Sequence, residues 1–204
     1  MNKKDKKSFK ETREYLISKI EKRLTDKRFE HTLRVEETAL KLAEIHKGDP
    51  YKVSLAAILH DNAKNYSNEK KLRLCNKYHV HLSKAEEENI DLVHSKLGGI
   101  LAKDKYHIDD IEIIHAIMYH TTGRPHMSKT EKIIYIADFI EPGRKEFPGL
   151  KKARELAEID LDLALIKILM LTINHIIDRG KIIDSITEET YEFYYKLYSH
   201  KHTP

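Results

Sequence analysis

The chain has 204 residues, of which 40% are hydrophobic and 34% are charged, with only 7 Gly and 5 Pro. This composition excludes collagen-like, low-complexity and disordered proteins, and the length is sufficient for one domain with a buried core. The formal net charge is +4, and a single cysteine, Cys75, stands against 13 histidines. A single cysteine excludes an internal disulfide and favours a reducing compartment. Any metal site must therefore use imidazole and carboxylate ligands rather than thiolates.

Positive charge is concentrated at the beginning of the chain, where residues 1–30 contain 11 Lys and Arg against 6 Asp and Glu. The charges alternate in sign as on a solvated helix, without a basic and aromatic stripe, so we do not expect a nucleic-acid partner. We expect residues 1–14 to form a basic N-terminal extension of the first helix. The sequence has neither an apolar leader nor an apolar run of about 18 residues, which predicts a cytoplasmic protein without a membrane partner.

Helical signals continue along the whole chain. Apolar residues recur at helical spacing across residues 27–47. Asp49 and Pro50 then predict an N-cap followed by proline at the first position of a helix that continues to about Ala63. Three further helix starts carry the capping-box pattern, with Ser at the N-cap and Glu three residues later. These boxes are Ser83 with Glu86, Ser128 with Glu131, and Ser185 with Glu188.

Helix ends are also marked, and strand signals are nearly absent. Pro142-Gly143 predicts the end of the helix that begins near Ser128, and Gly180 predicts a C-cap after residues 160–179. Sustained period-two alternation and hairpin turns are missing. The sequence therefore predicts a single compact all-α domain over residues 1–204, a helical bundle with its core at about residues 15–195.

Two segments between the predicted helices, residues 121–127 and residues 141–149, read as loops. Each of them carries an arginine next to a glycine, Arg124 in the first and Arg144 in the second. Because loops on a rigid helical framework often carry function, both arginines are candidate ligand-binding residues.

Several histidines and aspartates lie in apolar surroundings where a solvated side chain is not expected. His60 and Asp61 end the apolar run of residues 53–59, and Asp138 interrupts the apolar residues 133–140. Burial of such groups is costly unless they are paired or bind a metal. For Asp138 alone, an ion pair or hydrogen bond with another side chain is as good an explanation as a metal. The other candidate donors are His31, His94 and His120.

The order His, His-Asp, His, His, Asp resembles the HD superfamily of metal-dependent phosphohydrolases. Four longer stretches are similar to the YqeK family of bacterial HD-domain enzymes, which split diadenosine tetraphosphate symmetrically. The stretches are residues 31–35, 59–64, 119–124 and 136–144. The resemblance extends over about residues 15–195 and implies an all-α HD-domain fold, a bis(5'-nucleosyl)-tetraphosphatase activity and a dinucleoside polyphosphate or nucleotide as the small-molecule partner.

The resemblance implies six metal ligands and two divalent transition-metal ions. One ion would be held by His31, His60 and Asp138, and the second by His94 and His120, with Asp61 bridging both. The family implies iron, and imidazole with carboxylate also suits manganese, cobalt and zinc. The six implied ligands are His31, His60, Asp61, His94, His120 and Asp138.

The implied reaction is attack of a metal-bridging hydroxide on an inner phosphate, which gives two ADP molecules. Asp61 and Lys64 are the predicted catalytic residues. Lys64 would place a point charge on the polyphosphate, and Arg124 and Arg144 would bind its oxygens bidentately. Thr121 and Thr122 would either cap the local turn or donate to a phosphate.

Two positions depart from the family pattern, because Asn62 follows the His-Asp pair and Ser95 follows His94. Both positions would line the pocket. They leave open an HD phosphohydrolase that acts on another nucleotide, such as a deoxynucleotide or a guanosine polyphosphate. A non-catalytic nucleotide-binding HD protein is the alternative from another class, although all six ligands are present. A homodimer is compatible with the sequence.

Overall fold

A computed structural model describes residues 3–202 of the chain, with side chains from residue 9 to residue 200. These residues form eleven α-helices and one short 3-10 helix, without a strand, so the predicted all-α fold is confirmed for the described part. The basic extension expected at residues 1–14 lies partly outside it, namely residues 1–2 and the side chains of residues 3–8. None of the helices in residues 3–202 is long and apolar enough to cross a membrane.

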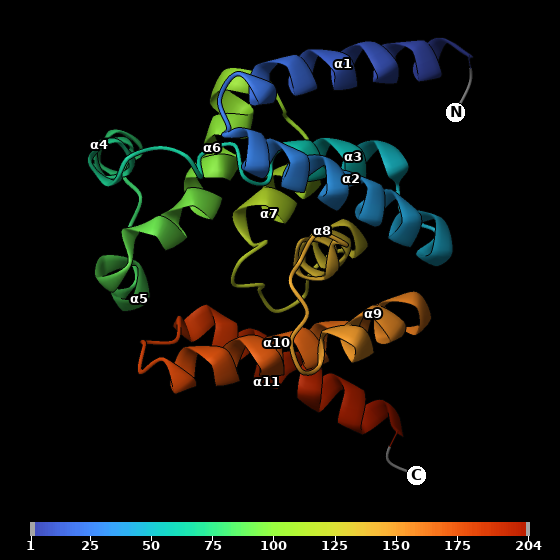
Figure 1. Cartoon of the computed structure of the whole chain (residues 1–204), viewed down its shortest axis with the longest axis vertical. Helices are drawn as coiled ribbons and strands as arrows, with labels where there is room; N and C mark the ends of the chain where they lie inside the picture. Colours follow the sequence, from blue (N-terminus) through green and yellow to red (C-terminus); the bar gives the residue numbers. More distant parts are fainter. Residues whose placement is uncertain (1–2, 203–204) are drawn as a thin grey trace.

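The first half of the chain contains the buried helix α3, two helices that pack against it, and a lobe that lies apart from it (Figure 1). Helices α1 and α2 run along one side of α3, and α4, α5 and the 3-10 helix η1 form a separate lobe beside α6. The bounds are α1 Lys3–Glu21, α2 Asp26–His46, α3 Pro50–Leu59, α4 Asn68–Tyr78, α5 Lys84–Glu88, η1 Ile90–Val93 and α6 His94–Tyr106.

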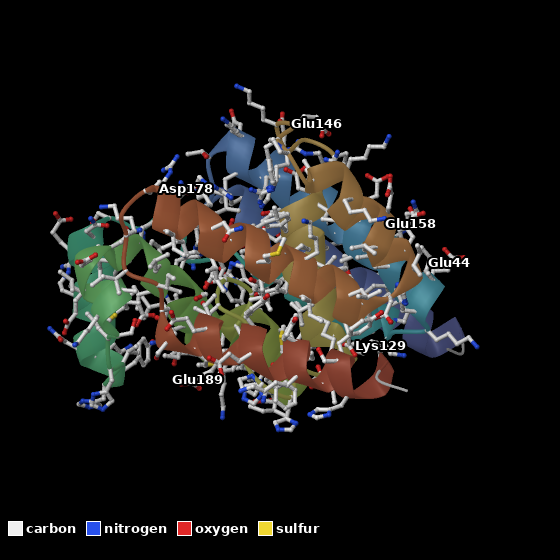
Figure 2. The ribbon with its side chains drawn as sticks, turned by 90° about the horizontal axis from the view of Figure 1, so that it is seen from below. Glu44, Lys129, Glu146, Glu158, Asp178 and Glu189 are labelled. Atoms are coloured by element: carbon white, nitrogen blue, oxygen red, sulfur yellow. The ribbon has the colours of Figure 1, made fainter. Side chains whose placement is uncertain are left out.

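The second half returns across α3 and ends in a pair of long helices. Helices α7 and α8 pack against α3, and α10 and α11 lie side by side as the layer seen from below in Figure 2. The bounds are α7 Ile111–Met118, α8 Lys129–Ile140, α9 Leu150–Ile159, α10 Leu161–Asp178 and α11 Ser185–His202.

Helix α3 is central because its sequence is apolar on every side, and all residues from Val53 to Leu59 are buried. Its start agrees with the prediction, since Asp49 accepts hydrogen bonds from two backbone amides of the first turn and Pro50 follows. Its predicted end at about Ala63 is wrong, because the helix stops at Leu59 and residues 60–65 form turns. Tertiary packing overrides local helix propensity at this point and directs both His60 and Asp61 inward.

Two of the three predicted capping boxes, at Ser83 and at Ser128, are present with both of their hydrogen bonds. The third is wrong, because Ser185 is the first residue inside α11 and Asp184 accepts the hydrogen bond from the Ile186 amide. Asp184 thus occupies the capping position, one residue before Ser185, and its backbone carbonyl accepts from the Thr187 amide.

The C-terminal helix α11 is anchored to the loop between α7 and α8. Tyr194 is 2% exposed, and its hydroxyl accepts a 2.8 Å hydrogen bond from the Met127 amide. Thr190, also buried, lies against Gly123, which has a φ of +68° and leaves no room for a Cβ beside that threonine. The loop that follows His120 is therefore held in place by side chains of α11.

Candidate metal centre

Four histidines and two aspartates from five parts of the fold converge beside α3. His31 lies on α2 and Asp138 on α8, while the others lie at the ends of α3, α6 and α7. All six were predicted from the sequence, and the fold brings them together at the point where the helices meet. The group consists of His31, His60, Asp61, His94, His120 and Asp138.

Asp61 occupies the middle of this group. Its Oδ1 atom lies 3.2 Å from Nε2 of His94 and 3.8 Å from Nε2 of His120. Its Oδ2 atom lies 3.3 Å from Nε2 of His60 and 3.9 Å from Nε2 of His31. The two oxygens of one carboxylate thus face two different pairs of imidazoles, which is the placement required of a carboxylate between two cations.

The remaining carboxylate completes one side of the centre. Asp138 Oδ1 lies 3.0 Å from Nε2 of His31. Ligand atoms of His31, His60 and Asp138 lie within 4.8 Å of one another, as do those of His60, Asp61 and His120. On the second side, Nε2 of His94 and Nε2 of His120 are 3.3 Å apart.

Each imidazole is held from behind through Nδ1. The partners are backbone carbonyls one turn earlier for three of the histidines and a carboxylate for the fourth. Because these oxygens only accept, a neutral imidazole held in this way carries its proton on Nδ1 and presents the lone pair of Nε2 to the centre. The distances are His60 to Ala57 O 2.6 Å, His94 to Asp91 O 2.6 Å, His120 to Ile117 O 2.7 Å, and His31 to Glu141 Oε1 3.2 Å.

Whether metal ions fit this centre can be judged from the hydrogen-bond partners of the Nε2 atoms that point into it. Nε2 of His31 and Nε2 of His60 are buried and have no hydrogen-bond partner among the described residues. The facing nitrogens of His94 and His120 cannot hydrogen-bond each other once both protons are on Nδ1. Buried acceptors that converge without a donor are costly, and a cation relieves that cost. The donor set therefore fits transition-metal ions.

Electrostatics acts differently on the side chains of the centre. Burial acts to lower the pKa of His60, but the Asp61 carboxylate outweighs it and raises that pKa. Burial and the neighbouring imidazoles of His60 and His94 lower the pKa of His120 to about 3, so this ring is neutral at physiological pH. Burial acts to raise the pKa of Asp61, but His60 and His94 outweigh it and hold the pKa well below its ordinary value. The carboxylate is accordingly ionised, as a ligand must be.

Two of the predicted substrate-binding cations are paired with carboxylates. Arg124 forms a bidentate ion pair with the buried Glu131, at 2.6 and 2.9 Å. Lys64 Nζ lies 2.6 Å from Asp91 Oδ2 and 3.5 Å from Nδ1 of His94. Lys64 is thus beside the centre, whereas Arg124 supports the start of α8.

Arg144 and the two threonines lie in the loops where they were expected. Arg144 Nη2 donates to the Asp138 carbonyl at 2.8 Å and lies 3.5 Å from Asp138 Oδ1. The hydroxyl of Thr121 donates to Ser95 Oγ, and that of Thr122 donates to the Gly123 carbonyl, both at 3.0 Å. Both threonines therefore have local partners, and Arg144 directly contacts a residue of the centre.

The two positions that depart from the family pattern take part in internal packing. Asn62 is fully buried and donates from Nδ2 to the carbonyls of Leu59 and Gly98, which ties the end of α3 to α6. Ser95 is buried between the Leu92 carbonyl and Thr121. Their effect on the centre is to fix the helix that carries His94.

Two residues at the centre were missed from the sequence. Arg28 Nη1 lies 2.9 Å from Asp61 Oδ2, and Glu141 joins Nδ1 of His31 to Nε of Arg34. The sequence offered a signal for Arg28, because it lies three residues before His31 on α2 and residues at that spacing share a helix face. Glu141 follows the end of α8 at Ile140, where helical spacing gives no such signal.

The all-α fold and its buried His and Asp cluster define a helical protein with a candidate metal centre. A family model described as the HD domain matches residues 28–143, more than half of the chain and a range that includes all six proposed ligands. The chain belongs to the HD domain family, and the expected resemblance is confirmed.

Several relatives match almost the whole chain. A protein of Bacillus subtilis named symmetrical bis(5'-nucleosyl)-tetraphosphatase is 38% identical, with 89% of this chain and 96% of the relative covered. A Staphylococcus aureus protein of the same name is also 38% identical, with 84% and 89% covered.

A solved structure shares the fold. It is the crystal structure of a Clostridium acetobutylicum protein described as a predicted HD superfamily hydrolase involved in NAD metabolism. The two chains are 39% identical with a TM-score of 0.86, and the match covers 90% of this chain and 97% of the other.

Proposed function

We propose that this chain is a metal-dependent phosphohydrolase that cleaves diadenosine tetraphosphate symmetrically into two ADP molecules. The observation that carries the proposal is the position of Asp61, whose two carboxylate oxygens each face a pair of imidazoles with inward lone pairs. Relatives named symmetrical bis(5'-nucleosyl)-tetraphosphatase, matched over at least 84% of this chain, support the substrate.

Two divalent ions are proposed as the cofactors, held by the six ligands with Asp61 shared between them. Bound there, they would lower the pKa of a water and offset charge on the phosphoryl oxygens. Iron is the proposed metal, with manganese, cobalt and zinc as the alternatives that the same donor set accepts.

The side chains of this protein contribute orientation and charge. The carbonyls behind His60, His94 and His120, and Glu141 behind His31, keep each Nε2 directed inward. Asp61 stays ionised in the middle of the group. We propose that the substrate is oriented by cations at the rim of this buried centre.

Among the predicted substrate-binding residues, Arg144 has the strongest support, because it already touches Asp138. Lys64 lies next to His94 but would have to share its ammonium with Asp91. The phosphate roles of Thr121, Thr122 and Arg124 stay predictions. We also propose a cytoplasmic location, which the single free cysteine, buried Cys75, supports.

The test is product analysis of the purified protein. The protein is reconstituted anaerobically with iron(II), and separately with manganese, cobalt or zinc, and incubated with diadenosine tetraphosphate in ¹⁸O-labelled water. We expect ADP alone, with the label on the terminal phosphate of one ADP per cleavage. ATP with AMP would exclude symmetrical cleavage, and turnover of a deoxynucleotide or guanosine polyphosphate instead would assign another substrate. Binding without turnover of any nucleotide would contradict the enzyme proposal.

A further inference from the structure

The proposed substrate carries a negative charge on each phosphate, and the cations predicted from the sequence do not all remain free to meet it. Glu131, which is 1% exposed, engages Arg124 through both of its oxygens. Asp91 engages Lys64 and also the buried Lys71. Withdrawal of Arg124 would leave the buried Glu131 without this partner, which is unfavourable. Asp91 is 43% exposed and would keep Lys71, but it competes with a ligand for Lys64.

Arg28 has a different position from these paired cations. It lies in the first turn of α2, and its side chain is 34% exposed, while the Asp61 carboxylate that it reaches is 3% exposed. The guanidinium therefore extends from the solvent side to the centre. It uses Nη1 for Asp61, and a guanidinium carries five N–H donors in a planar fork.

Arg28 has a counterpart on the other carboxylate of the centre. The Arg144 side chain is 35% exposed and contacts Asp138, and its Nε is buried without a hydrogen-bond partner among the described residues. Each of the two aspartates is thus contacted by a different, partly exposed arginine: Asp61 by Arg28 and Asp138 by Arg144. Both guanidinium groups therefore have N–H donors that these contacts leave unused.

Charge indicates what these arginines would bind. Four neutral imidazoles and two carboxylates hold two negative charges, so two divalent ions leave the centre positive. Both oxygens of Asp61 then face cations, and the guanidinium of Arg28 needs another source of negative charge. A polyphosphate supplies it, and guanidinium groups match phosphate oxygens bidentately.

We propose that Arg28 is a phosphate-binding residue, which together with Arg144 flanks the polyphosphate over the two aspartates. The proposal rests on the proposed function for the identity of the substrate. It does not rest on turnover, because phosphate binding to the metal-loaded protein is measured independently of hydrolysis.

The test compares Arg28→Gln with Arg28→Lys and with a matched control, Lys27→Gln. Lys27 is the neighbouring residue, carries the same charge and is exposed on the same turn of α2. Metal content is measured by mass spectrometry. Calorimetry measures the Kd of the metal-loaded protein for two probes, inorganic phosphate and a bridged analogue. The bridged analogue is a diadenosine tetraphosphate with a central methylene group, which cannot be cleaved at its centre. KM and kcat are measured with the natural substrate.

We expect Arg28→Gln to retain the wild-type metal content and to bind the bridged analogue about 10- to 100-fold more weakly, since it loses a charged hydrogen bond. KM rises more than kcat falls. Arg28→Lys recovers part of the affinity, and Lys27→Gln stays within about twofold of the wild type.

The proposal would be overturned if Arg28→Gln bound phosphate and the analogue as tightly as the wild type. It would also be overturned if the variant lost metal while the protein molecules that still hold metal bound both probes with unchanged affinity. That second result would assign Arg28 to the orientation of Asp61 alone. A wild-type protein that binds neither probe would also overturn it. If the wild type binds both probes and cleaves no dinucleotide, the proposed function fails while Arg28 is still judged by the affinities.

Discussion

The inner face of the metal centre and its rim are held in different ways. On the inner face, imidazoles are fixed by short hydrogen bonds to carbonyls of their own helical turn, as in His60 to Ala57 and His120 to Ile117. At the rim, cations are held by ion pairs between side chains, as in Lys64 with Asp91 and Arg124 with Glu131. The difference indicates that the inner face is preorganised for metal, whereas a partly exposed rim pair such as Lys64 with Asp91 can change partners when a ligand arrives.

The most severe disruption of the inner face is expected from Asp61→Asn. The amide keeps the volume of the carboxylate but removes its charge and places an N–H group among inward lone pairs. We expect metal affinity to fall by more than about 100-fold, beyond the effect of losing an outer partner. Metal content by mass spectrometry and helicity by circular dichroism are the measurements. Wild-type metal content in a folded variant would contradict a central role for Asp61.

A smaller effect is expected when the support of one imidazole is weakened. Glu141 accepts from His31 Nδ1 at 3.2 Å, and Glu141→Gln replaces this carboxylate with a poorer acceptor. Metal affinity should fall by about 10- to 100-fold. Glu146→Gln, a change to an exposed residue of the same loop, is the control and should have no effect. Equal metal affinities in the two variants would show that His31 is held by its helix alone.

At the rim, Arg124→Gln distinguishes structural support from substrate binding. Loss of the bidentate partner leaves Glu131 buried, so we expect the free energy of unfolding in urea to fall by about 1–3 kcal/mol. KM should stay within about twofold of the wild type. A large rise in KM with unchanged stability would restore the phosphate role predicted from the sequence.

The smallest effect is expected at an ion pair of similar chemistry on the side of the fold where α3 meets α7. Lys52 Nζ lies 3.0 Å from Asp110 and 2.7 Å from Glu112. Partial burial raises the pKa of both carboxyls, but the hydrogen bonds from Lys52 outweigh it and lower each pKa. The stabilisation is thus present above their ordinary pKa values, near 4, and lost as the pH falls through the lowered values.

Because these side chains are partly exposed, Lys52→Gln should reduce the free energy of unfolding by less than about 1 kcal/mol at pH 6. The difference from the wild type should be smaller at pH 2, because protonation of the two carboxyls removes their attraction to Lys52. Urea unfolding of both proteins at the two pH values is the measurement, and a difference that is the same at both would contradict the assignment.

The same contrast explains what could be predicted from the sequence. His60, Asp61 and Asp138 stand out because polar groups interrupt apolar helical segments, so local pattern alone indicates burial. The contact of Arg28 with Asp61 joins residues 33 positions apart, and an arginine in an exposed helical turn has the pattern of a solvated residue. Long-range partner choice depends on the packing of α2 against α3, which periodicity does not encode.

Local errors have a similar origin. The prediction that α3 continues to about Ala63 followed helix propensity, but burial of the His60 ring and of Asn62 required the chain to turn. The predicted cap at Ser185 failed because Asp184, one residue earlier, caps the helix and also accepts a hydrogen bond from Ser83. In both cases a tertiary contact accompanies the departure from the local prediction.

Helix α11 gives the C-terminus a part in the geometry of a distant loop. The segment matched by the HD domain model stops at residue 143, yet the Met127 amide and the left-handed turn at Gly123 are secured by Tyr194 and Thr190. A fragment confined to the matched segment would keep every proposed ligand while losing the surface that fixes the loop after His120. The part of the chain that supports the centre is therefore larger than the matched segment, because α11 holds the loop at Gly123 and Met127, which directly follows the proposed ligand His120.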